Sequence, residues 1–237
     1  YYSKKHKFFI FYFFVSFGNR KKNLYVLELK KQRRFIDMEH SPLQKARYSY
    51  QPKLPMILRS EMSEIEAVEG AKTESARDKE KIQALFPTTF GQKEISFQKG
   101  KSKAEKKKHV VGVILSGGQA PGGHNVVSGL YDALKKADKD NELIGFLGGP
   151  SGLTDDKFIV FTDEYINEFR NTGGFDIIGS GRTKLETTEQ FEKAAAVCKK
   201  HGITAITIIG GDDSNTNAAV LAEYFKAHDT GVQVIGC

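Results

Sequence analysis

Seven residues that follow an apolar run carry the groups that a site for phosphate and a divalent cation would need. The run, at 203–209, is rich in β-branched residues and leads directly into Gly210-Gly211-Asp212-Asp213-Ser214-Asn215-Thr216. Glycine lets backbone N–H groups approach an anion closely, and carboxylate oxygens are ligands that Mg2+ prefers. The stretch therefore predicts a magnesium and phosphate site at the end of a strand. The pair Asp212-Asp213 also fits the N-terminus of a helix, where aspartate is favoured.

A second glycine-rich turn joins the apolar run 110–115 to a helical pattern at about 125–136. It reads Ser116-Gly117-Gly118-Gln119-Ala120-Pro121-Gly122-Gly123-His124-Asn125. Its backbone N–H groups, together with the N-terminus of the helix, could hold an anion. The spacing matches neither the P-loop nor the dinucleotide motif G-x-G-x-x-G, and tight strand–helix packing would need glycines as well. His124 has no identifiable partner in the sequence, so it is interpreted as a polar turn residue rather than a ligand or base.

A third segment with the same character is Gly179-Ser180-Gly181-Arg182, which follows a short apolar element at 176–178. In open parallel sheets, ligands bind beyond the carboxyl ends of the strands, so the three glycine-bearing turns should meet at one edge. Gly118 would supply backbone donors there and Arg182 a guanidinium for phosphate. One aspartate would suffice for Mg2+, because substrate phosphates and water complete its ligand set.

The elements that must position these turns are predicted from His109 onward. Apolar runs of strand length alternate there with helical patterns, which is typical of an α/β fold with a Rossmann-like parallel sheet and crossover helices. Strands are expected at 110–115, 143–147, 203–209 and 232–235, with the short element at 176–178. Helices are expected at about 125–136, between Thr187 and Gly202, and at about 215–227.

Local signals delimit the middle helix. Thr187 can cap backbone N–H groups while Gln190 reaches back to it, and Gly202 can close the far end. Cys198 falls on the apolar face of this helix and is interpreted as a core residue. The acidic pairs at 155–156 and 163–164 are expected in solvated loops.

The charge of the chain is concentrated at its start. The 237 residues are 39% hydrophobic, enough for a sizeable core, and carry a net charge of +7. Ten Lys and Arg oppose two acids in residues 1–37, a net +8, so residues 38–237 carry −1. A nearly neutral body offers no broad surface for nucleic acid, and none is expected as a partner. The basic run at 99–108 is interpreted as a solvated linker rather than a phosphate grip.

Targeting and redox signals are sparse. The two cysteines give no disulfide or metal-thiolate framework, and such sparing use fits a reducing cytosol. Residues 1–17 are basic and then apolar like a signal sequence, but the run is too short to span a bilayer and no small-residue cleavage site follows. Because the composition changes at Met38, the first methionine, residues 1–37 are interpreted as upstream or vector sequence, with a targeting segment as the alternative. We expect a cytoplasmic protein with no membrane partner.

Five motifs together resemble the pyrophosphate-dependent phosphofructokinases. They are the turn at 116–125, Gly145-Phe146-Leu147-Gly148-Gly149-Pro150, Gly173-Gly174-Phe175-Asp176, Gly179-Ser180-Gly181-Arg182 and the stretch at 210–217. The resemblance covers 38–237, including Tyr48-Ser49-Tyr50-Gln51-Pro52-Lys53-Leu54-Pro55, and points to the long form of plants, some protists and some bacteria. It implies the phosphofructokinase fold and transfer of the terminal phosphoryl group of pyrophosphate to the 1-hydroxyl of fructose 6-phosphate in glycolysis. It also implies Mg2+ and an oligomeric full-length protein.

The resemblance assigns a set of residues to the phosphoryl donor: Gly117, Gly118, Arg182, Asp213 and Ser214. Asp212 would hold Mg2+. Asp213 would set donor specificity and act on the transition state, because relatives that use ATP have glycine at this position. A carboxylate there would repel the α-phosphate of ATP and tolerate the shorter pyrophosphate.

The sequence departs from the family pattern at its end. A proline-lysine-threonine-isoleucine-aspartate-glycine-aspartate segment supplies the catalytic base in the family, and it does not occur in the 237 residues. We therefore expect the base to lie beyond Cys237, and the truncated chain to have half a site and little or no activity of its own. Two alternatives are a non-catalytic regulatory subunit or fragment of the same family, and an ATP-dependent sugar-phosphate or NAD kinase.

Three parts of the chain are expected on these grounds. Residues 1–37 form the non-native or upstream segment, and 38–108 form an N-terminal extension with a basic linker, in which 76–85 is the best short helix. Residues 109–237 form the phosphoryl-donor-binding part of an incomplete phosphofructokinase domain.

Overall fold

Residues 41–100 and 107–237 are described by the computed structural model, so the predictions for residues 1–37 lie outside the described part of the chain. The chain divides into two units between Lys45 and Ala46, and the helix α2 (Pro42–Ser49) crosses this boundary. All other elements described below belong to the second unit.

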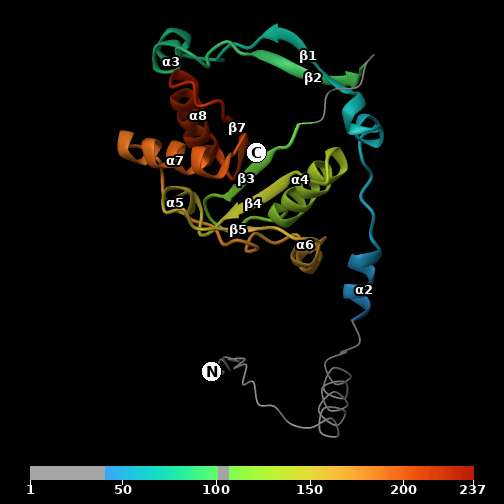
Figure 1. Cartoon of the computed structure of the whole chain (residues 1–237). Coiled ribbons are helices and arrows are strands. Elements are labelled where there is room, and N and C mark those ends of the chain that lie inside the picture. Colours follow the sequence, from blue (N-terminus) through green and yellow to red (C-terminus); the bar gives the residue numbers. More distant parts are fainter. Residues whose placement is uncertain (1–40, 101–106) are drawn as a thin grey trace, which may run out of the picture. The chain divides into compact units, whose positions relative to one another are not determined.

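A five-stranded sheet in the order β5-β4-β3-β6-β7 forms the centre of the second unit (Figure 1). The strands β3 (Val110–Leu115), β4 (Glu142–Phe146), β6 (Ala205–Ile209) and β7 (Gln233–Gly236) are parallel. The predicted α/β fold with crossover helices is thus confirmed. One edge strand was not predicted: β5 (Phe158–Val160) pairs antiparallel with β4. With three residues, β5 is too short to show a pattern in the sequence.

Apolar side chains on both faces of the sheet explain why helices cover it on both sides. Alternate residues of a strand point to opposite faces, and in β3 both sets are buried. Val113 packs with residues of α4 (Gly123–Ala137) and α6 (Asp163–Phe169), whereas Ile114 packs with residues of three other helices. These are α5 (Pro150–Thr154), α7 (Thr188–His201) and α8 (Asp212–Ala227).

The end signals of α7 are as predicted. The Thr187 hydroxyl accepts a hydrogen bond from the Gln190 N–H, the Gln190 side chain accepts one from the Thr187 N–H, and Gly202 closes the helix at φ 63°. Cys198 is 1% exposed, and burial raises the pKa of its thiol to about 12. The core assignment of Cys198 is therefore confirmed.

Several boundaries differ from the predictions near the turns. Helix α8 begins at Asp212 instead of near Asn215, so the two aspartates belong to its first turn. Residues 176–178 are irregular rather than a strand, and Gly181 forms an isolated parallel bridge with Ser116. A third glycine-bearing segment therefore reaches the sheet edge as a loop that lies alongside the end of β3.

The acidic pairs at 155–156 and 163–164 were expected in solvated loops. Asp155, Asp163 and Glu164 are exposed as expected, but the second pair lies in the helix α6 and Asp156 is only partly exposed. Asp156 is 2.6 Å from Lys200 Nζ and 2.7 Å from His201 Nε2, and the hydrogen bond from Lys200 lowers the pKa of the Asp156 carboxyl. Asp163 begins α6 and accepts a hydrogen bond from the Tyr131 hydroxyl at 2.8 Å. Both carboxylates meet partners that are distant in sequence, which local composition does not reveal.

The N-terminal extension contains a β-hairpin that was not predicted. Its strands β1 (Ile65–Lys72) and β2 (Lys93–Lys99) pair antiparallel, and α3 (Lys79–Leu85) lies between them in sequence. Two short 3-10 helices, η1 (Met56–Arg59) and η2 (Met62–Glu64), precede it. The strand β2 is exposed at every position, so it lacks the alternation by which a half-buried strand is recognised.

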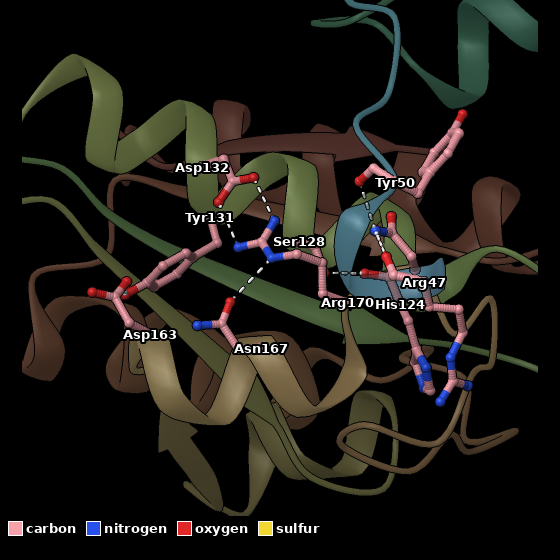
Figure 2. A network of polar contacts seen from close by, with 10 residues as sticks. Arg47, Tyr50, His124, Ser128, Tyr131, Asp132, Asp163, Asn167 and Arg170 are labelled. Carbon is pink, nitrogen blue, oxygen red and sulfur yellow. Dashed lines mark hydrogen bonds and ion pairs between the residues drawn. The ribbon is translucent and has the colours of Figure 1, made fainter. Parts of the chain in front are cut away.

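Side chains of the main domain hold the start of this extension (Figure 2). The Asn171 amide donates to the carbonyl oxygens of Arg47 at 2.8 Å and Tyr50 at 3.2 Å. The neighbouring Arg170 forms a bidentate pair with Asp132 of α4 at 2.7 and 2.9 Å.

No helix within residues 41–100 and 107–237 has both the length and the apolar character needed to cross a membrane.

Candidate functional site

The turns that follow β3 and β6, together with the loop at 181–184, line one hollow of about 520 Å3. Every residue that was predicted to contact the donor or the metal lies on its wall: Gly117, Gly118, Arg182, Asp212, Asp213 and Ser214. The convergence of three distant segments was expected from the topology rule for open sheets. Their individual roles stay predictions.

The first turn of α8 forms one side of the hollow. Gly211 is the N-cap of this helix, and the cap makes no side-chain hydrogen bond. The alternative reading of Asp212-Asp213 as residues of a helix N-terminus is confirmed, since both lie in the first turn of α8, although neither is the N-cap itself. Both residues are exposed, and the unpaired N–H groups of a helix N-terminus favour anions. The arrangement leaves the carboxylate oxygens available for a ligand.

Two buried hydroxyls join the turn after β3 to α8. The Ser214 hydroxyl donates to Ser116 Oγ at 2.9 Å, and both residues are less than a tenth exposed. Gly210 lies against this pair, since a Cβ at this position would be 2.5 Å from the Ser116 carbonyl oxygen. The proton of Ser214 is thus engaged inside the protein, and the residue fixes the wall of the hollow.

The two glycines of the first turn have different surroundings. The Gly117 N–H donates to the Gly181 carbonyl at 2.8 Å, whereas the Gly118 N–H has no partner within the described residues. A Cβ on Gly118 would be 2.8 Å from Arg182 Nη2, so the guanidinium lies directly over this glycine. In the described part of the chain, Arg182 makes no ion pair or hydrogen bond. A free amide beside an unpaired guanidinium is a suitable site for a phosphate group.

The N-terminus of α4 does not line the hollow. Two amides there are occupied, because Gly122 N–H donates to the Gly173 carbonyl at 2.8 Å and His124 N–H donates to the Gly174 carbonyl at 2.9 Å. The glycines here serve packing, since a Cβ on Gly123 would be 2.3 Å from the Phe175 ring. The helix end that borders the hollow belongs to α8 instead.

His124 is a buried structural residue with several partners. The Thr172 hydroxyl donates to the Phe169 carbonyl at 2.6 Å, so it accepts from His124 Nδ1–H, also at 2.6 Å. His124 Nε2 in turn accepts the N–H groups of Asp176 and Ile177, both at 3.0 Å. Burial lowers the pKa of the ring and outweighs the Asp176 carboxylate, which raises it. The neutral ring therefore holds the loop that leads to Arg182.

The architecture and the hollow can be compared with known proteins. The phosphofructokinase family model matches residues 110–237, more than half of the chain. The chain belongs to the phosphofructokinase family. The family relationship inferred from the motifs is thereby confirmed.

Three relatives of this phosphofructokinase family chain are named pyrophosphate–fructose 6-phosphate 1-phosphotransferase. The Porphyromonas gingivalis protein is 54% identical over 200 residues, which cover 84% of this chain and 36% of the relative. The Treponema pallidum protein is 43% identical over 208 residues, with coverage of 84% and 36%. The Solanum tuberosum protein, a beta subunit, is 43% identical over 200 residues, with coverage of 84% and 35%. The chain spans little more than a third of the length of these relatives.

The carboxylates fit a magnesium ion that binds together with a phosphate ligand. Magnesium in phosphoryl-transfer sites takes one or two carboxylates, and substrate phosphates and water fill the other positions. Asp212 and Asp213 provide that number beside the hollow. In the part of the chain that the structure describes, no group of three or more His, Cys, Asp or Glu could form a complete protein cage for a metal.

Two residues on the wall of the hollow were not identified from the sequence of this phosphofructokinase family chain. Lys184 Nζ is 3.9 Å from Asp213 Oδ1, and Asn217 binds both backbone groups of Leu185. The spacing of Lys184, two residues after Arg182, is the available signal, because alternate residues of an extended segment point to the same side. Asn217 gives no such signal, since its partner is 32 residues away.

Proposed function

We propose that this chain is the donor-binding part of a pyrophosphate-dependent phosphofructokinase. In this function the terminal phosphoryl group of pyrophosphate is transferred to the 1-hydroxyl of fructose 6-phosphate. The observation that carries the proposal is the Asp213 carboxylate on the wall of a hollow that also holds an unpaired arginine. A carboxylate at that point repels the additional phosphate of a nucleotide but leaves room for a diphosphate.

Individual residues receive roles on this basis. The Gly118 N–H and the Arg182 guanidinium bind phosphate oxygens, and Gly117 and Ser214 shape the turn that presents them. Asp212 holds the magnesium ion, which neutralises charge on the donor when bound. The chain contributes positioning and charge neutralisation, which account for most of phosphoryl-transfer catalysis.

The acceptor side of the reaction is placed outside this chain. The named relatives are more than twice as long as this chain. We assign the catalytic base and the sugar-phosphate site to the remaining length of such a protein. Residues 109–237 then form the donor-binding part, and 38–108 form the extension that precedes it in the sequence. An oligomeric, cytoplasmic full-length protein belongs to the same proposal, and the beta-subunit name of the potato relative supports a multi-subunit assembly.

Calorimetric titration of the purified chain with pyrophosphate and with ATP, each in excess Mg2+, tests the proposal. Pyrophosphate should bind, ATP should bind at least roughly 10-fold more weakly, and Arg182→Gln should weaken pyrophosphate binding by a similar factor. Equal or tighter binding of ATP would contradict it and favour the nucleotide-dependent alternative. Absence of pyrophosphate binding would contradict it as well.

A further inference from the structure

Lys184 is the second cation on the wall of the donor hollow, and it follows Arg182 by two residues. The segment between them is irregular and extended, and Leu185, next in the chain, is buried at 1% exposure. Lys184 itself is half exposed, with its ammonium group toward Asp213. The side chain therefore projects into the hollow while its neighbour is fixed in the core.

Two hydrogen bonds join the backbone next to Lys184 to α8, the helix that contains Asp213. Asn217 of α8 accepts the Leu185 N–H at 3.0 Å and donates to the Leu185 carbonyl at 2.7 Å. A pair of bonds of this kind reproduces the pairing of a neighbouring strand and fixes the position of the segment. The backbone segments that carry Lys184 and Asp213 are thus held next to each other, and their exposed side chains meet above them.

A second cationic side chain at the hollow favours the binding of an anion. Four charged side chains line it, the acids Asp212 and Asp213 and the bases Arg182 and Lys184. With Arg182 alone the wall would carry a net negative charge and repel a diphosphate. Lys184 brings the sum to zero before any metal ion is added.

The contact between Lys184 and Asp213 leaves the ammonium group available. Its length of 3.9 Å exceeds that of a hydrogen bond, and the two side chains are 52% and 89% exposed. Ion pairs of this exposure contribute little to stability. The three N–H donors of Lys184 can therefore turn from the carboxylate to a phosphate at small cost.

The same pair stands between the donor hollow and a second hollow of about 350 Å3. Lys184, Asp213 and Asn217 line both, and the second continues along α8 to Thr216 and Val220. A donor longer than a diphosphate would have to pass the pair to enter this space. The position makes the pair, rather than Asp213 alone, the boundary that a nucleotide would meet.

We propose that Lys184 binds the outer phosphate of pyrophosphate, the phosphate that leaves, and that together with Asp213 it closes the donor hollow toward the second hollow. This inference rests on the proposed function, since it concerns the same donor. Lys184 would thereby make binding depend on the length of the donor. Its ammonium group contacts the leaving phosphate, while Arg182 binds the phosphate at the other end, over Gly118.

Titration of the chain with pyrophosphate in excess Mg2+ tests this role. Lys184→Gln should weaken binding by roughly 10-fold or more, and Lys184→Arg should restore most of the affinity, because a charge-assisted contact is lost and then replaced. Lys199→Gln, which removes the same charge from an exposed position of α7, should leave binding unchanged. Lys184→Met, which keeps the aliphatic chain, provides a second neutral variant, and melting temperatures without ligand should be equal for all variants.

A second titration examines the boundary. In the Asp213→Gly background ATP should bind measurably, and adding Lys184→Gln should remove that gain, because the freed ammonium group would hold a nucleotide phosphate. If Arg182→Gln weakens pyrophosphate binding and Lys184→Gln does not, the role of Lys184 is refuted while the proposed function stands. If the unmodified chain does not bind pyrophosphate, the proposed function and this inference both fall.

Discussion

One carboxylate oxygen of Glu223 accepts two hydrogen bonds from Thr88, from its N–H at 2.9 Å and from its hydroxyl at 2.7 Å. The other oxygen accepts the corresponding pair from Thr89, at 2.9 and 2.6 Å. Burial alone would raise the pKa of Glu223, but the bonds from Thr89 and Thr88 together hold it below its ordinary value. This carboxylate joins the turn between α3 and β2 to the helix that begins at Asp212.

Replacing Glu223 by Gln should lower the free energy of unfolding by about 1–3 kcal/mol, because an amide nitrogen would meet donors in place of an acceptor. Urea unfolding at neutral pH measures the change, and Glu192→Gln on the exposed side of α7 is the matched control. Since the folded pKa is depressed, the contribution is present above pH ~4.3 and is lost as the pH falls through the folded pKa. Equal stability of the two variants would show that the junction does not contribute.

Asp213→Gly should increase the affinity for ATP by roughly 10-fold or more and change that for pyrophosphate little, because the carboxylate acts by repulsion. Asp213→Asn keeps the shape and removes the charge, so it should give part of the gain. Calorimetric titration with both donors in excess Mg2+ provides the comparison. If neither variant gains affinity for ATP, Asp213 does not exclude nucleotides.

Gly118→Ala should weaken pyrophosphate binding several-fold while the free energy of unfolding changes by less than about 0.5 kcal/mol. The new Cβ would displace the exposed end of Arg182, a flexible group, rather than any backbone. Gly129→Ala in α4, where a Cβ meets nothing within 4 Å, is the control and should leave binding unchanged. A loss of stability without a loss of affinity would place Arg182 away from the donor.

His124 should make the stability of the protein depend on pH. Burial, opposed by Asp176, lowers its pKa, so the unfolded chain takes up a proton below about pH 6.5 while the folded protein keeps the ring neutral. The contribution is complete above that pH and decreases as the pH falls toward the folded pKa. Thermal unfolding between pH 7.5 and 5.5 should show a smaller decrease for His124→Gln than for the unmodified chain. His228→Gln, at an exposed position, should retain the full decrease, and parallel curves for all three proteins would exclude this role of His124.

The parts of the fold that follow from local chemistry were predictable. Thr187, Gln190 and Gly202 fixed both ends of α7, and the alternation of apolar runs identified the parallel strands. The pairing of β1 with β2 was not predictable, because β2 is exposed at every position and no residue of β1 is buried. Backbone hydrogen bonds, rather than burial of side chains, define this pair of strands, and the sequence carries little signal for backbone pairing.

In the site, too, some residues were predictable from local sequence and others were not. Glycines and aspartates at strand ends indicated Gly118, Arg182 and Asp212, since the topology of a parallel sheet brings such ends together. The hydrogen bonds at the N-terminus of α4 were not predictable, because the carbonyl groups that accept them come from residues about 50 positions later in the chain. Contacts of this kind depend on tertiary structure, which no window of sequence contains.

The hydrogen bond between Ser116 and Ser214 spans 98 residues of sequence and is buried. Three of the five strands, β4, β5 and β6, lie between these two positions in the sequence, so the contact depends on the docking of the intervening strands and helices. Breaking it from the native side likewise requires the strands around it to separate. The nearby amide of Gly117, bonded to Gly181, should therefore exchange its hydrogen for deuterium only through global opening, and its exchange rate would report the stability of the whole domain.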